Sequence, residues 1–419
     1  MLYERWLEVV REHGDERALQ HTASGRAWTF RELRAAGEAQ TTPAAPAFFP
    51  RGNTPEFLFA LLAAWRTGGL ACPVEPDQTP PTVPPPPPWC RHLKMTSGTT
   101  GAARFVAFTP EQLAADAAEI VATMGLRPEW PNLGVISAAH SYGFSNLVLP
   151  LLLHGVPLIL AASPLPEAVR SAAAGAPKLT LAGVPFLWRA WHEAGAIPAN
   201  VVLAISAGAP LPLNVERDIF ERRGLKVHNF YGASECGGIA YDDSPEPRSD
   251  AALVGRPMRQ VSLALTEAGC WSVRGPAVGE TYWPEAAAAL GGGTFVTSDL
   301  GELRDGWVYV RGRAGDQINV AGRKVSPETV ERALLAHPRV RECLVFGMPE
   351  AQHGRGEAIV AVVAAAASEG ELREFARAAL PAWQVPREWR LVDTLGTGPR
   401  GKLSRAEWRR RFAAEAPAS

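Results

Sequence analysis

The stretch TSGTTGAAR, residues 96–104, says most about how this chain folds and what it can bind. It follows a short apolar run and brings many backbone N–H groups and hydroxyls into a small space. The glycines Gly98 and Gly101 allow the main chain to adopt positive φ and to approach a ligand closely. Successive amides in such a turn form a concave nest for an anion, most often a phosphate. Taken alone, the stretch indicates either a phosphate-binding loop or a flexible polar turn.

Apolar runs beyond this stretch alternate with alanine-rich helical patterns. FVAFT at 105–109 predicts a strand, and residues 110–124 predict a helix with proline in its first turn. Further buried strands are predicted at 134–137, 178–183 and 201–206, and residues 147–160 are predicted to be buried core. This alternation is typical of an α/β domain whose sheets are mainly parallel.

The pattern of predicted helices and strands changes twice toward the C-terminus. From about residue 252 to residue 312, short alternating strands with glycine turns suggest an antiparallel, barrel-like subdomain. After Gly315, helix and strand patterns of a separate small α+β domain follow. We therefore predict an α/β protein with an N-terminal domain at 1–313, a C-terminal domain at 316–419 and a hinge at Gly315.

Composition excludes several classes of function. The 419 residues carry a net charge of -1, so no basic field exists to hold a nucleic acid or an anionic membrane. The five cysteines are odd in number and scattered, which favours a reduced cytoplasm over a disulfide framework. Residues 147–160 are too short to span a bilayer, and the N-terminus lacks the apolar core of a signal peptide. We expect a cytoplasmic protein that is a monomer or a homodimer.

Further blocks follow 96–104 in order: SAGAPL (206–211), NFYGASE (229–235), TSDLG (297–301), GRAGDQINVAGRKVSPETVE (312–331) and PRGKLSR (399–405). Together these blocks resemble the core motifs of the adenylate-forming superfamily, which comprises acyl- and aryl-CoA synthetases, amino-acid adenylation domains and firefly-type luciferases. The resemblance covers nearly the whole chain, although the region before Thr96 is shorter than the family norm by some tens of residues.

The resemblance implies an ATP site assembled from several blocks. The 96–104 loop would hold the β- and γ-phosphates, with Arg104 in the place of the family's usual lysine. Arginine keeps the charge and adds a bidentate fork, so we expect phosphate binding to survive. The residues placed around the nucleotide are Thr96, Ser97, Gly98, Thr99, Thr100, Gly101, Arg104, Gly208, Ala209, Pro210, Asn229, Phe230, Tyr231, Gly232, Ala233, Ser234, Asp299, Arg313 and Lys402.

Individual roles within this set follow from the family pattern. Tyr231 would stack on adenine, with the backbone of 208–210 on the other side, and Asp299 would accept the ribose hydroxyls. Ser234 stands where threonine is commoner and would bond the α-phosphate. Glu235 resembles the family's Mg²⁺ ligand, and Mg²⁺ suits one protein carboxylate together with phosphate oxygens and waters.

The resemblance also implies two positively charged side chains beside the reacting nucleotide. Arg313 resembles the cation beside ribose and phosphate, and Lys402 resembles the catalytic lysine. Attack of a carboxylate on the α-phosphate builds negative charge, which an ammonium delivered by the small domain would stabilise. For the second half-reaction the small domain would rotate about Gly315 and bring Val320, Ala321 and Gly322 to the acyl-adenylate as the passage for pantetheine. The family usually has Asp or Lys at the hinge position.

The acid itself is less well defined by sequence. His140 resembles a histidine that gates the acyl pocket in many CoA ligases and could orient the carboxylate, although a structural histidine is nearly as good a reading. No Asp or Glu occurs between Trp130 and Pro166, which disfavours an amino-acid substrate. From their positions, an apolar slot for an aryl or medium-chain acid would be lined by His140, Tyr142, Phe144, Phe186, Gly237 and Gly238.

Three hypotheses remain open at this point. The first is an acid–CoA ligase that uses ATP, Mg²⁺ and coenzyme A. The second shares the adenylation step but transfers the acyl group to the phosphopantetheine of an acyl carrier protein. The third is an inactive nucleotide-binding or scaffold descendant, and the presence of Glu235, Asp299, Arg313 and Lys402 argues against it.

Overall fold

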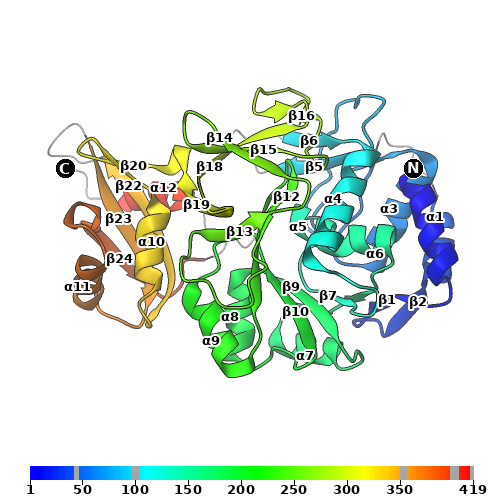
Figure 1. Ribbon diagram of the computed structural model, residues 1–419, viewed down its shortest axis with the longest axis horizontal. Helices are drawn as coiled ribbons and strands as arrows, with labels where there is room; N and C mark the ends of the chain where they lie inside the picture. The colour runs from blue at the N-terminus through cyan, green and yellow to red at the C-terminus, as the bar shows by residue number, and fades with distance from the viewer. Residues whose placement is uncertain (42–46, 97–103, 350–355, 397–404, 416–419) are drawn as a thin grey trace.

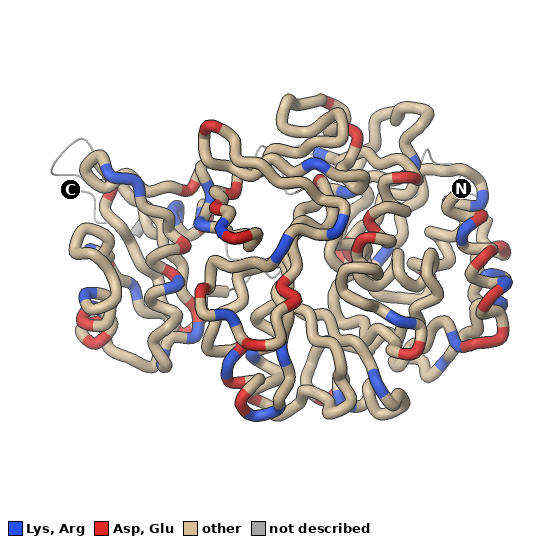
Figure 2. The backbone as a smooth tube through the Cα atoms, in the orientation of Figure 1, with Lys and Arg blue, Asp and Glu red and all other residues tan. Residues whose placement is uncertain are grey.

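The computed structural model describes residues 1–41, 47–96, 104–349, 356–396 and 405–415. The molecule is elongated, with the N-terminal helix α1 (Leu2–His13) at one end and the C-terminal domain at the other (Figure 1). Acidic and basic residues are interspersed along the backbone (Figure 2), as expected for a net charge of -1. In the part of the chain that the structure describes, no helix is long and apolar enough to cross a membrane.

One large sheet forms the centre of the N-terminal domain. Its middle is parallel, in the order β11-β10-β9-β7-β8-β1, and β2 pairs antiparallel at the edge. These strands are β1 (Arg17–His21), β2 (Arg26–Thr29), β7 (Asn132–Gly134), β8 (Leu158–Leu160), β9 (Leu179–Gly183), β10 (Val201–Ser206) and β11 (Val227–Ala233). The α/β class predicted from the alternation of strands and helices is thus confirmed.

Antiparallel strands continue the same sheet beyond β11. The order is β14-β15-β18-β19-β13-β12-β11, with β17 paired to β18, so the predicted antiparallel subdomain shares hydrogen bonds with the parallel strands. Its strands are β12 (Gly237–Tyr241), β13 (Leu253–Pro257), β14 (Ser262–Leu265), β15 (Cys270–Arg274), β17 (Leu290–Gly291), β18 (Thr294–Arg304) and β19 (Trp307–Arg313).

A second sheet lies at the top of Figure 1 and has the order β16-β6-β5-β4-β3. Its strands are β3 (Ala47–Phe48), β4 (Leu70–Ala71), β5 (His92–Thr96), β6 (Arg104–Phe108) and β16 (Thr281–Trp283). The sheet joins the first hundred residues to β16, which comes from the antiparallel region. This pairing of β16 with β6 brings distant parts of the sequence to one place.

The helices of the N-terminal domain cover the sheets. They are α1, α2 (Phe30–Glu38), α3 (Pro55–Thr67), α4 (Pro110–Met124), α5 (Ser141–Gly143), α6 (Leu149–His154), α7 (Pro166–Ala173), α8 (Pro185–Glu193) and α9 (Leu213–Arg223), with a π-helical segment η1 (Phe144–Val148) before α6. Helix α4 shows why the sequence prediction succeeded. Thr109 and Gln112 form a capping box, Pro110 occupies the first turn, and Gly125 ends the helix at φ 67°.

The C-terminal domain is a small α+β unit, as predicted. A short 3₁₀ turn η2 (Ala314–Asp316) leads into it. Its remaining elements are β20 (Ile318–Val320), β21 (Arg323–Val325), α10 (Pro327–Leu335), β22 (Val340–Pro349), β23 (Glu357–Ala365), α11 (Glu369–Ala379), η3 (Ala382–Gln384), β24 (Glu388–Val392) and α12 (Arg405–Glu415). Its hydrophobic core, which begins at Ile318, is separate from the N-terminal core, and we propose the domain boundary at 313–316 on this basis.

One strand prediction was displaced. The run at 134–137 was expected to be a strand, whereas β7 ends at Gly134. Beyond it, the amide of Asn53 donates to the carbonyl of Ile136 at 2.8 Å and accepts from the N–H of Ala138 at 2.6 Å. Because a side chain satisfies these backbone groups, the segment leaves the sheet and turns toward α5.

Candidate active site

Three residues predicted to bind the nucleoside meet in one cluster. The hydroxyl of Tyr231, near the end of β11, donates to Oδ2 of Asp299 on β18 at 2.5 Å. Nε of Arg313, the last residue of β19, donates to Oδ1 of the same carboxylate at 3.1 Å. Burial and the neighbouring carboxylate raise the pKa of Tyr231 well above its ordinary value, so its hydroxyl keeps its proton. We call Tyr231, Asp299 and Arg313 the ribose cluster.

The register of the β18–β19 hairpin brings Asp299 opposite Arg313. The hairpin turns at Asp305 and Gly306, both at positive φ (51° and 77°), in the manner of a two-residue Asp-Gly turn. The pairing then shifts by one residue between Leu300 and Gly301. Without this bulge the strand would continue in the turn's register and Asp299 would face a different partner.

A second cluster joins the predicted phosphate cation to the predicted metal ligand. The guanidinium carbon of Arg104, at the start of β6, lies 3.6 Å from the centre of the Tyr282 ring. The hydroxyl of Tyr282, on β16, donates to Oε1 of Glu235 at 3.1 Å. Burial and the neighbouring Glu235 raise the pKa of Tyr282, which therefore stays a donor. We call Arg104, Tyr282 and Glu235 the phosphate cluster.

Tyr282 was missed by sequence reasoning. Nothing in the local sequence GETYW marks it, because its role follows from the antiparallel pairing of β16 with β6, which sets Tyr282 opposite Val106. The backbone supports the same contact, since the N–H of Gly279 donates to the carbonyl of Glu235 at 2.8 Å. Only the tertiary pairing of strands far apart in the sequence reveals this tyrosine.

The glycine-rich stretch joins two paired strands. Thr96 and Arg104 are the last partners of the β5–β6 ladder, and the hydroxyl of Thr96 donates to the carbonyl of Arg104 at 3.1 Å. The predicted phosphate-binding residues between them lie outside the described residues; these are Ser97, Gly98, Thr99, Thr100 and Gly101. The ladder therefore places Thr96 directly opposite Arg104, a member of the phosphate cluster.

Other residues predicted to contact the nucleotide divide into exposed and buried ones. Gly208, Ala209 and Pro210 form an exposed loop after β10, with Gly208 at φ 86°, and so present backbone to a ligand. In contrast, the side chain of Asn229 is buried and donates to the carbonyl of Leu253 at 3.4 Å.

The remaining members of this stretch belong to β11 or follow it. Phe230 packs in the core, its ring 6.0 Å from that of Tyr142, so its side chain serves packing. Gly232 and Ala233 continue the strand, and a Cβ at Gly232 would lie 2.6 Å from the carbonyl oxygen of Gly237. Ser234 lies just beyond β11, partly buried and next to Glu235.

The residues of the predicted acyl pocket have different surroundings in the structure. Phe144 is a core residue, 1% exposed, and its ring stacks on the buried ring of His92 with centroids 4.4 Å apart. Phe186 lies on α8 with 60% of its side chain exposed, so it could meet a ligand only at an open surface. Tyr142 is partly buried, and its hydroxyl donates to the carbonyl of Ile205 at 3.3 Å. His140 precedes α5 and is partly buried.

The two glycines of the predicted slot are packed closely. Gly237 adopts φ 68°, and a Cβ there would lie 2.3 Å from Oδ1 of Asp116. At Gly238 a Cβ would lie 2.9 Å from both Met258 and Phe230. Any larger residue at either position would displace these neighbours. Both glycines therefore permit close packing in the strand that follows Glu235.

Behind Gly237 lies a buried charge network that the sequence did not indicate. Nζ of Lys94, on β5, is 3.5 Å from Oδ2 of Asp116 on α4 and 3.5 Å from the hydroxyl of Ser145. Ser145 in turn donates to Asp116 at 2.5 Å. Lys94 and Asp116 are 5% and 3% exposed, so each charge is buried beside its partner. This pair supports the strand that follows Glu235 from behind.

The predicted pantetheine passage forms a tight hairpin. Val320 and Arg323 are the last pair of β20 and β21, and the turn residues Ala321 and Gly322 have φ of 49° and 86°. Gly322 donates its N–H to Oδ1 of Asn319 at 2.9 Å. Positive φ at both central positions is typical of a two-residue hairpin turn. Both turn residues are exposed.

Gly315 lies in η2, between the two domains. A Cβ added there would meet nothing within 4 Å, so no packing demands glycine at this position. Lys402, the predicted catalytic residue, lies outside the described residues. The hinge and catalytic roles of these two residues therefore remain predictions.

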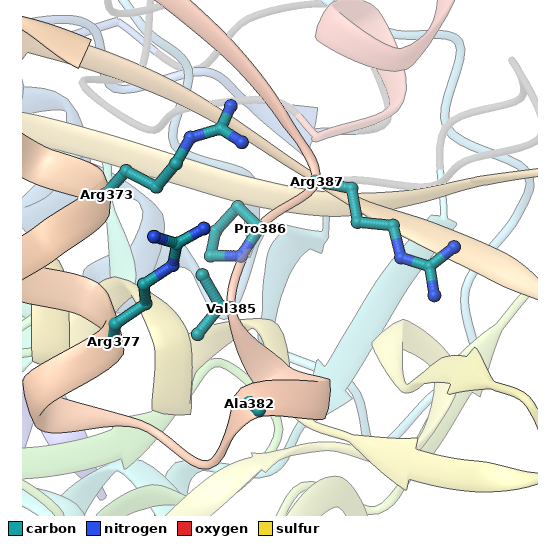
Figure 3. Close-up of a pocket in the computed structure, with 6 residues that line it drawn as sticks. All are labelled: Arg373, Arg377, Ala382, Val385, Pro386 and Arg387. Carbon is teal, nitrogen blue, oxygen red and sulfur yellow. The ribbon is translucent and has the colours of Figure 1, made fainter. Parts of the chain in front are cut away.

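A pocket of about 430 Å³ lies on the C-terminal domain between α11 and the segment after η3 (Figure 3). Its lining includes Arg373, Arg377 and Arg387. Arg373 and Arg377 extend from one helix, whereas Arg387 points away on the other side of Pro386. None of the residues of the ribose or phosphate cluster lines this pocket.

The donor set suits Mg²⁺ held with a nucleotide. Among the described residues, no group of three or more His, Cys, Asp and Glu side chains could hold a metal ion. Glu235 offers a single partly buried carboxylate within the phosphate cluster. Mg²⁺ is usually bound by one or two carboxylates with substrate phosphates and waters, which this arrangement fits.

Comparison with known proteins identifies a family and several relatives of this chain. The chain matches the AMP-binding enzyme family over residues 91–283 and the AMP-binding enzyme C-terminal domain over residues 329–402. A feruloyl-CoA synthase of an Amycolatopsis species is 29% identical over 343 residues, which span 76% of this chain and 69% of the relative. A probable 2-succinylbenzoate–CoA ligase of Mycobacterium tuberculosis is 30% identical over 341 residues, spanning 77% of this chain and 84% of the relative.

The fold is shared with a solved structure over nearly its full length. ATP-bound MatB from Rhodopseudomonas palustris superimposes with a TM-score of 0.85 at 20% identity, covering 98% of each chain. The match to the AMP-binding enzyme family includes Arg104 on β6, Glu235 between β11 and β12, and Tyr282 on β16. The chain belongs to the AMP-binding enzyme family, within the adenylate-forming superfamily of acyl- and aryl-CoA synthetases.

Proposed function

We propose that the protein is an AMP-forming acid–CoA ligase that works in two half-reactions. A substrate carboxylate oxygen attacks the α-phosphorus of ATP. The bond from the α-phosphorus to the oxygen of the β-phosphate breaks, so that pyrophosphate is released and an acyl-adenylate is formed. The sulfur of coenzyme A, after losing its proton, then attacks the acyl carbon, and AMP leaves with the electrons of the acyl–oxygen bond. The products are a thioester and AMP.

The observation that carries this proposal is that residues 231–235, at the end of β11 and just beyond it, supply one member of the ribose cluster and one of the phosphate cluster. Tyr231 and Glu235 are four residues apart, and each makes contact with a different distant strand. One cluster offers a carboxylate and a cation to a ribose, and the other offers a guanidinium to phosphates and a carboxylate to Mg²⁺. A nucleoside triphosphate needs both sets of groups.

The remaining chemistry falls to residues whose roles are part of the proposal. Lys402 would stabilise the charge that develops on the α-phosphate, and Ser234 would donate to an α-phosphate oxygen. His140 would orient the carboxylate of the acid. When bound, Mg²⁺ would supply positive charge against the leaving pyrophosphate, with Glu235 as its protein ligand.

The names of the relatives inform the choice of acid and acceptor. The feruloyl and 2-succinylbenzoyl groups of two relatives are both aryl acyl groups, and both relatives are named for CoA thioesters. We propose a hydrophobic aryl acid as substrate and coenzyme A as acceptor. The five cysteines are free and buried, which suits the reducing cytoplasm where coenzyme A is abundant.

Pyrophosphate release separates the candidate functions. The protein is incubated with ATP, Mg²⁺ and a panel of aryl, short-chain and medium-chain acids, with coenzyme A, with a holo-carrier protein, or with neither. We expect acid-dependent pyrophosphate release and a thioester that forms with coenzyme A. Thioester formation only with the carrier protein would favour the second hypothesis, and no acid-dependent release with any acid would support the inactive descendant.

Lys402→Ala tests the assignment of the catalytic lysine. Loss of a group that stabilises developing charge should slow acyl-adenylate formation by about 10²–10³-fold. Thioester formation from supplied acyl-adenylate should stay near the wild-type rate, because the lysine is proposed to act only in the first step. An equal fall in both half-reactions would contradict the two-conformation mechanism.

A further inference from the structure

Arg405 is an unusually well-held arginine at the start of α12. Its Nη1 lies 2.9 Å from Asp316, and its Nη2 lies 2.9 Å from Glu328 and 2.8 Å from Glu331. Its Nε donates to the carbonyl of Val345 at 3.1 Å. The guanidinium is 22% exposed and meets three carboxylates on two segments, so its planar fork fixes both position and orientation.

The neighbouring arginines of α12 are held quite differently. Arg411 is 55% exposed, pairs with Glu407 one turn earlier in the same helix, and lies 5.3 Å from the centre of the Trp408 ring. Arg409 is 48% exposed and lies 4.0 Å from Glu357. Exposed pairs of this kind contribute little to stability. Arg405 therefore differs from the other arginines of its helix in being more buried and in having more carboxylate partners.

The segment before Arg405 is fixed at its other end as well. Leu395 is 1% exposed, and its N–H donates to Oε2 of Glu342 at 2.8 Å. Its carbonyl accepts from Nε1 of Trp408, on α12, at 3.1 Å. The two ends of the segment from 395 to 405 are thus tied to α12, to β22 and to α10.

The partners of Arg405 connect it to the proposed hinge. Asp316 is the last residue of η2 and directly follows Gly315. Glu328 and Glu331 lie on α10, the first helix of the C-terminal domain. Arg405 therefore joins the C-terminal side of the hinge to a point three residues after Lys402. Three residues of chain span at most about 11 Å, so whatever holds Arg405 limits how far Lys402 can lie from it.

We propose that Arg405 is a positioning residue for Lys402, holding it to the hinge-side frame of the C-terminal domain during acyl-adenylate formation. The inference rests on the function proposed above. Rigid support of this kind matters because a displacement of about 1 Å in a reacting group can cost about 10²-fold in rate.

The test separates positioning from a merely structural role. Arg405→Gln should lower kcat for acyl-adenylate formation by about 10- to 100-fold, the scale for a slightly misplaced catalytic group. The KM values for ATP and acid should stay unchanged, and so should thioester formation from supplied acyl-adenylate. Arg405→Lys keeps the charge but not the fork, and its rate should lie between those of Arg405→Gln and wild type. Arg410→Gln, at an exposed position of the same helix, is the matched control and should match wild type throughout.

Two milder variants keep the test useful if Arg405→Gln folds poorly, as judged by its thermal unfolding. Asp316→Asn leaves Arg405 paired with Glu328 and Glu331, and Trp408→Phe keeps the ring but removes the donor to Leu395. Each should slow adenylation several-fold without affecting the thioester step. Equal loss in both half-reactions, or wild-type adenylation in all these variants, would overturn the inference.

Failure of the proposed function gives a different result. In that case wild-type protein would release no acid-dependent pyrophosphate, or Lys402→Ala would adenylate normally. If both of these controls behave as proposed while the Arg405, Asp316 and Trp408 variants match wild type, only the positioning role is wrong.

Discussion

At the scale of single residues, hydrogen bonds from neighbouring side chains orient the carboxylates of the candidate site. Asp299 accepts from both Tyr231 and Arg313, so its two oxygens are already oriented in the described structure. Glu235 is oriented in the same way by Tyr282. Such support reduces the number of side-chain conformations that a bound nucleotide must restrict.

The Tyr231 hydroxyl offers a direct test of the ribose cluster. Tyr231→Phe removes a hydrogen bond to a charged group, which typically contributes about 1.5–3 kcal/mol, so the KM for ATP should rise by about tenfold or more. The value of kcat should change less, because the ribose is remote from the reacting phosphorus. Initial rates at varied ATP concentration measure both constants.

Tyr3→Phe is the matched control for that variant. Its hydroxyl also donates to a carboxylate, Glu38, at 2.9 Å, but on α1 and α2 rather than in the cluster. It should leave the KM for ATP at the wild-type value. A similar KM for ATP in Tyr231→Phe and Tyr3→Phe would show that the ribose cluster does not bind the nucleotide.

The buried Lys94–Asp116 pair predicts a large stability effect. Lys94→Met leaves the Asp116 carboxylate buried without its cation, and breaking a buried pair in this way costs about 3–5 kcal/mol in the free energy of unfolding. Arg34→Met is the control, since its pair with Glu38 is 43% and 39% exposed and should contribute no more than about 1 kcal/mol. Urea unfolding measures both, and near-equal losses would contradict the prediction.

At the scale of elements, hairpins with glycine-containing turns position the functional residues. In β18–β19 the turn at Asp305 and Gly306 sets the register, and the later bulge brings Asp299 opposite Arg313. The β20–β21 hairpin presents its exposed turn in a similar way. A short turn with fixed φ leaves little freedom in what the flanking strands present.

Gly322→Trp tests the proposed passage for pantetheine. A bulky side chain on this turn should slow thioester formation by about 10²-fold, as expected for a misplaced reactant, while acyl-adenylate formation continues. Gly25→Trp is the control, because Gly25 also has positive φ (69°) with nothing within 4 Å of an added Cβ. Unchanged coenzyme A turnover in Gly322→Trp, measured as thioester formed per unit time, would refute the passage.

At the scale of the whole molecule, the largest hydrophobic core of the N-terminal domain is separate from that of the C-terminal domain. The N-terminal core ends with Val308, and the C-terminal core begins with Ile318. One contact across the connection between the two domains is the hydrogen bond that Arg332 donates to the carbonyl of Val310 at 3.3 Å. Domains with separate cores are free to turn against each other unless a large hydrophobic interface joins them.

The stability of the C-terminal domain should depend on pH through Glu331. Burial raises the pKa of Glu331 from 4.5 to about 7, although Arg405 opposes the shift. The native state therefore holds a proton that the unfolded chain releases near pH 4.5, and the free energy of unfolding falls as pH rises toward 7, by at most about 3 kcal/mol. Glu328, Asp316 and Cys343 are the other titratable groups beside this pair.

Glu331→Gln should remove this part of the pH dependence. Chemical unfolding between pH 5 and pH 8 should show a steeper loss of stability in wild type than in the variant. Arg373→Gln, which removes only an exposed pair with Glu369, should keep the wild-type slope. Identical slopes for wild type and Glu331→Gln would place the titrating group elsewhere.

The sequence by itself determined the elements and the order of the motifs. Helix α4 could be predicted to the residue because its cap, its first-turn proline and its final glycine are all local signals. The α/β class and the small C-terminal domain followed from hydrophobic patterns of the same local kind. The roles of Tyr231, Asp299 and Arg313 were drawn from motif resemblance, and the structure brings the three together.

Only the tertiary structure decided which side chains meet. Tyr282, the Lys94–Asp116 pair and the partners of Arg405 depend on contacts between segments far apart in the chain, and no local pattern encodes such contacts. Phe144, predicted to line a pocket, packs in the core against His92 for the same reason. The hydrophobic pattern of a sequence predicts that a side chain is buried. The packing of strands and helices decides which residues it packs against.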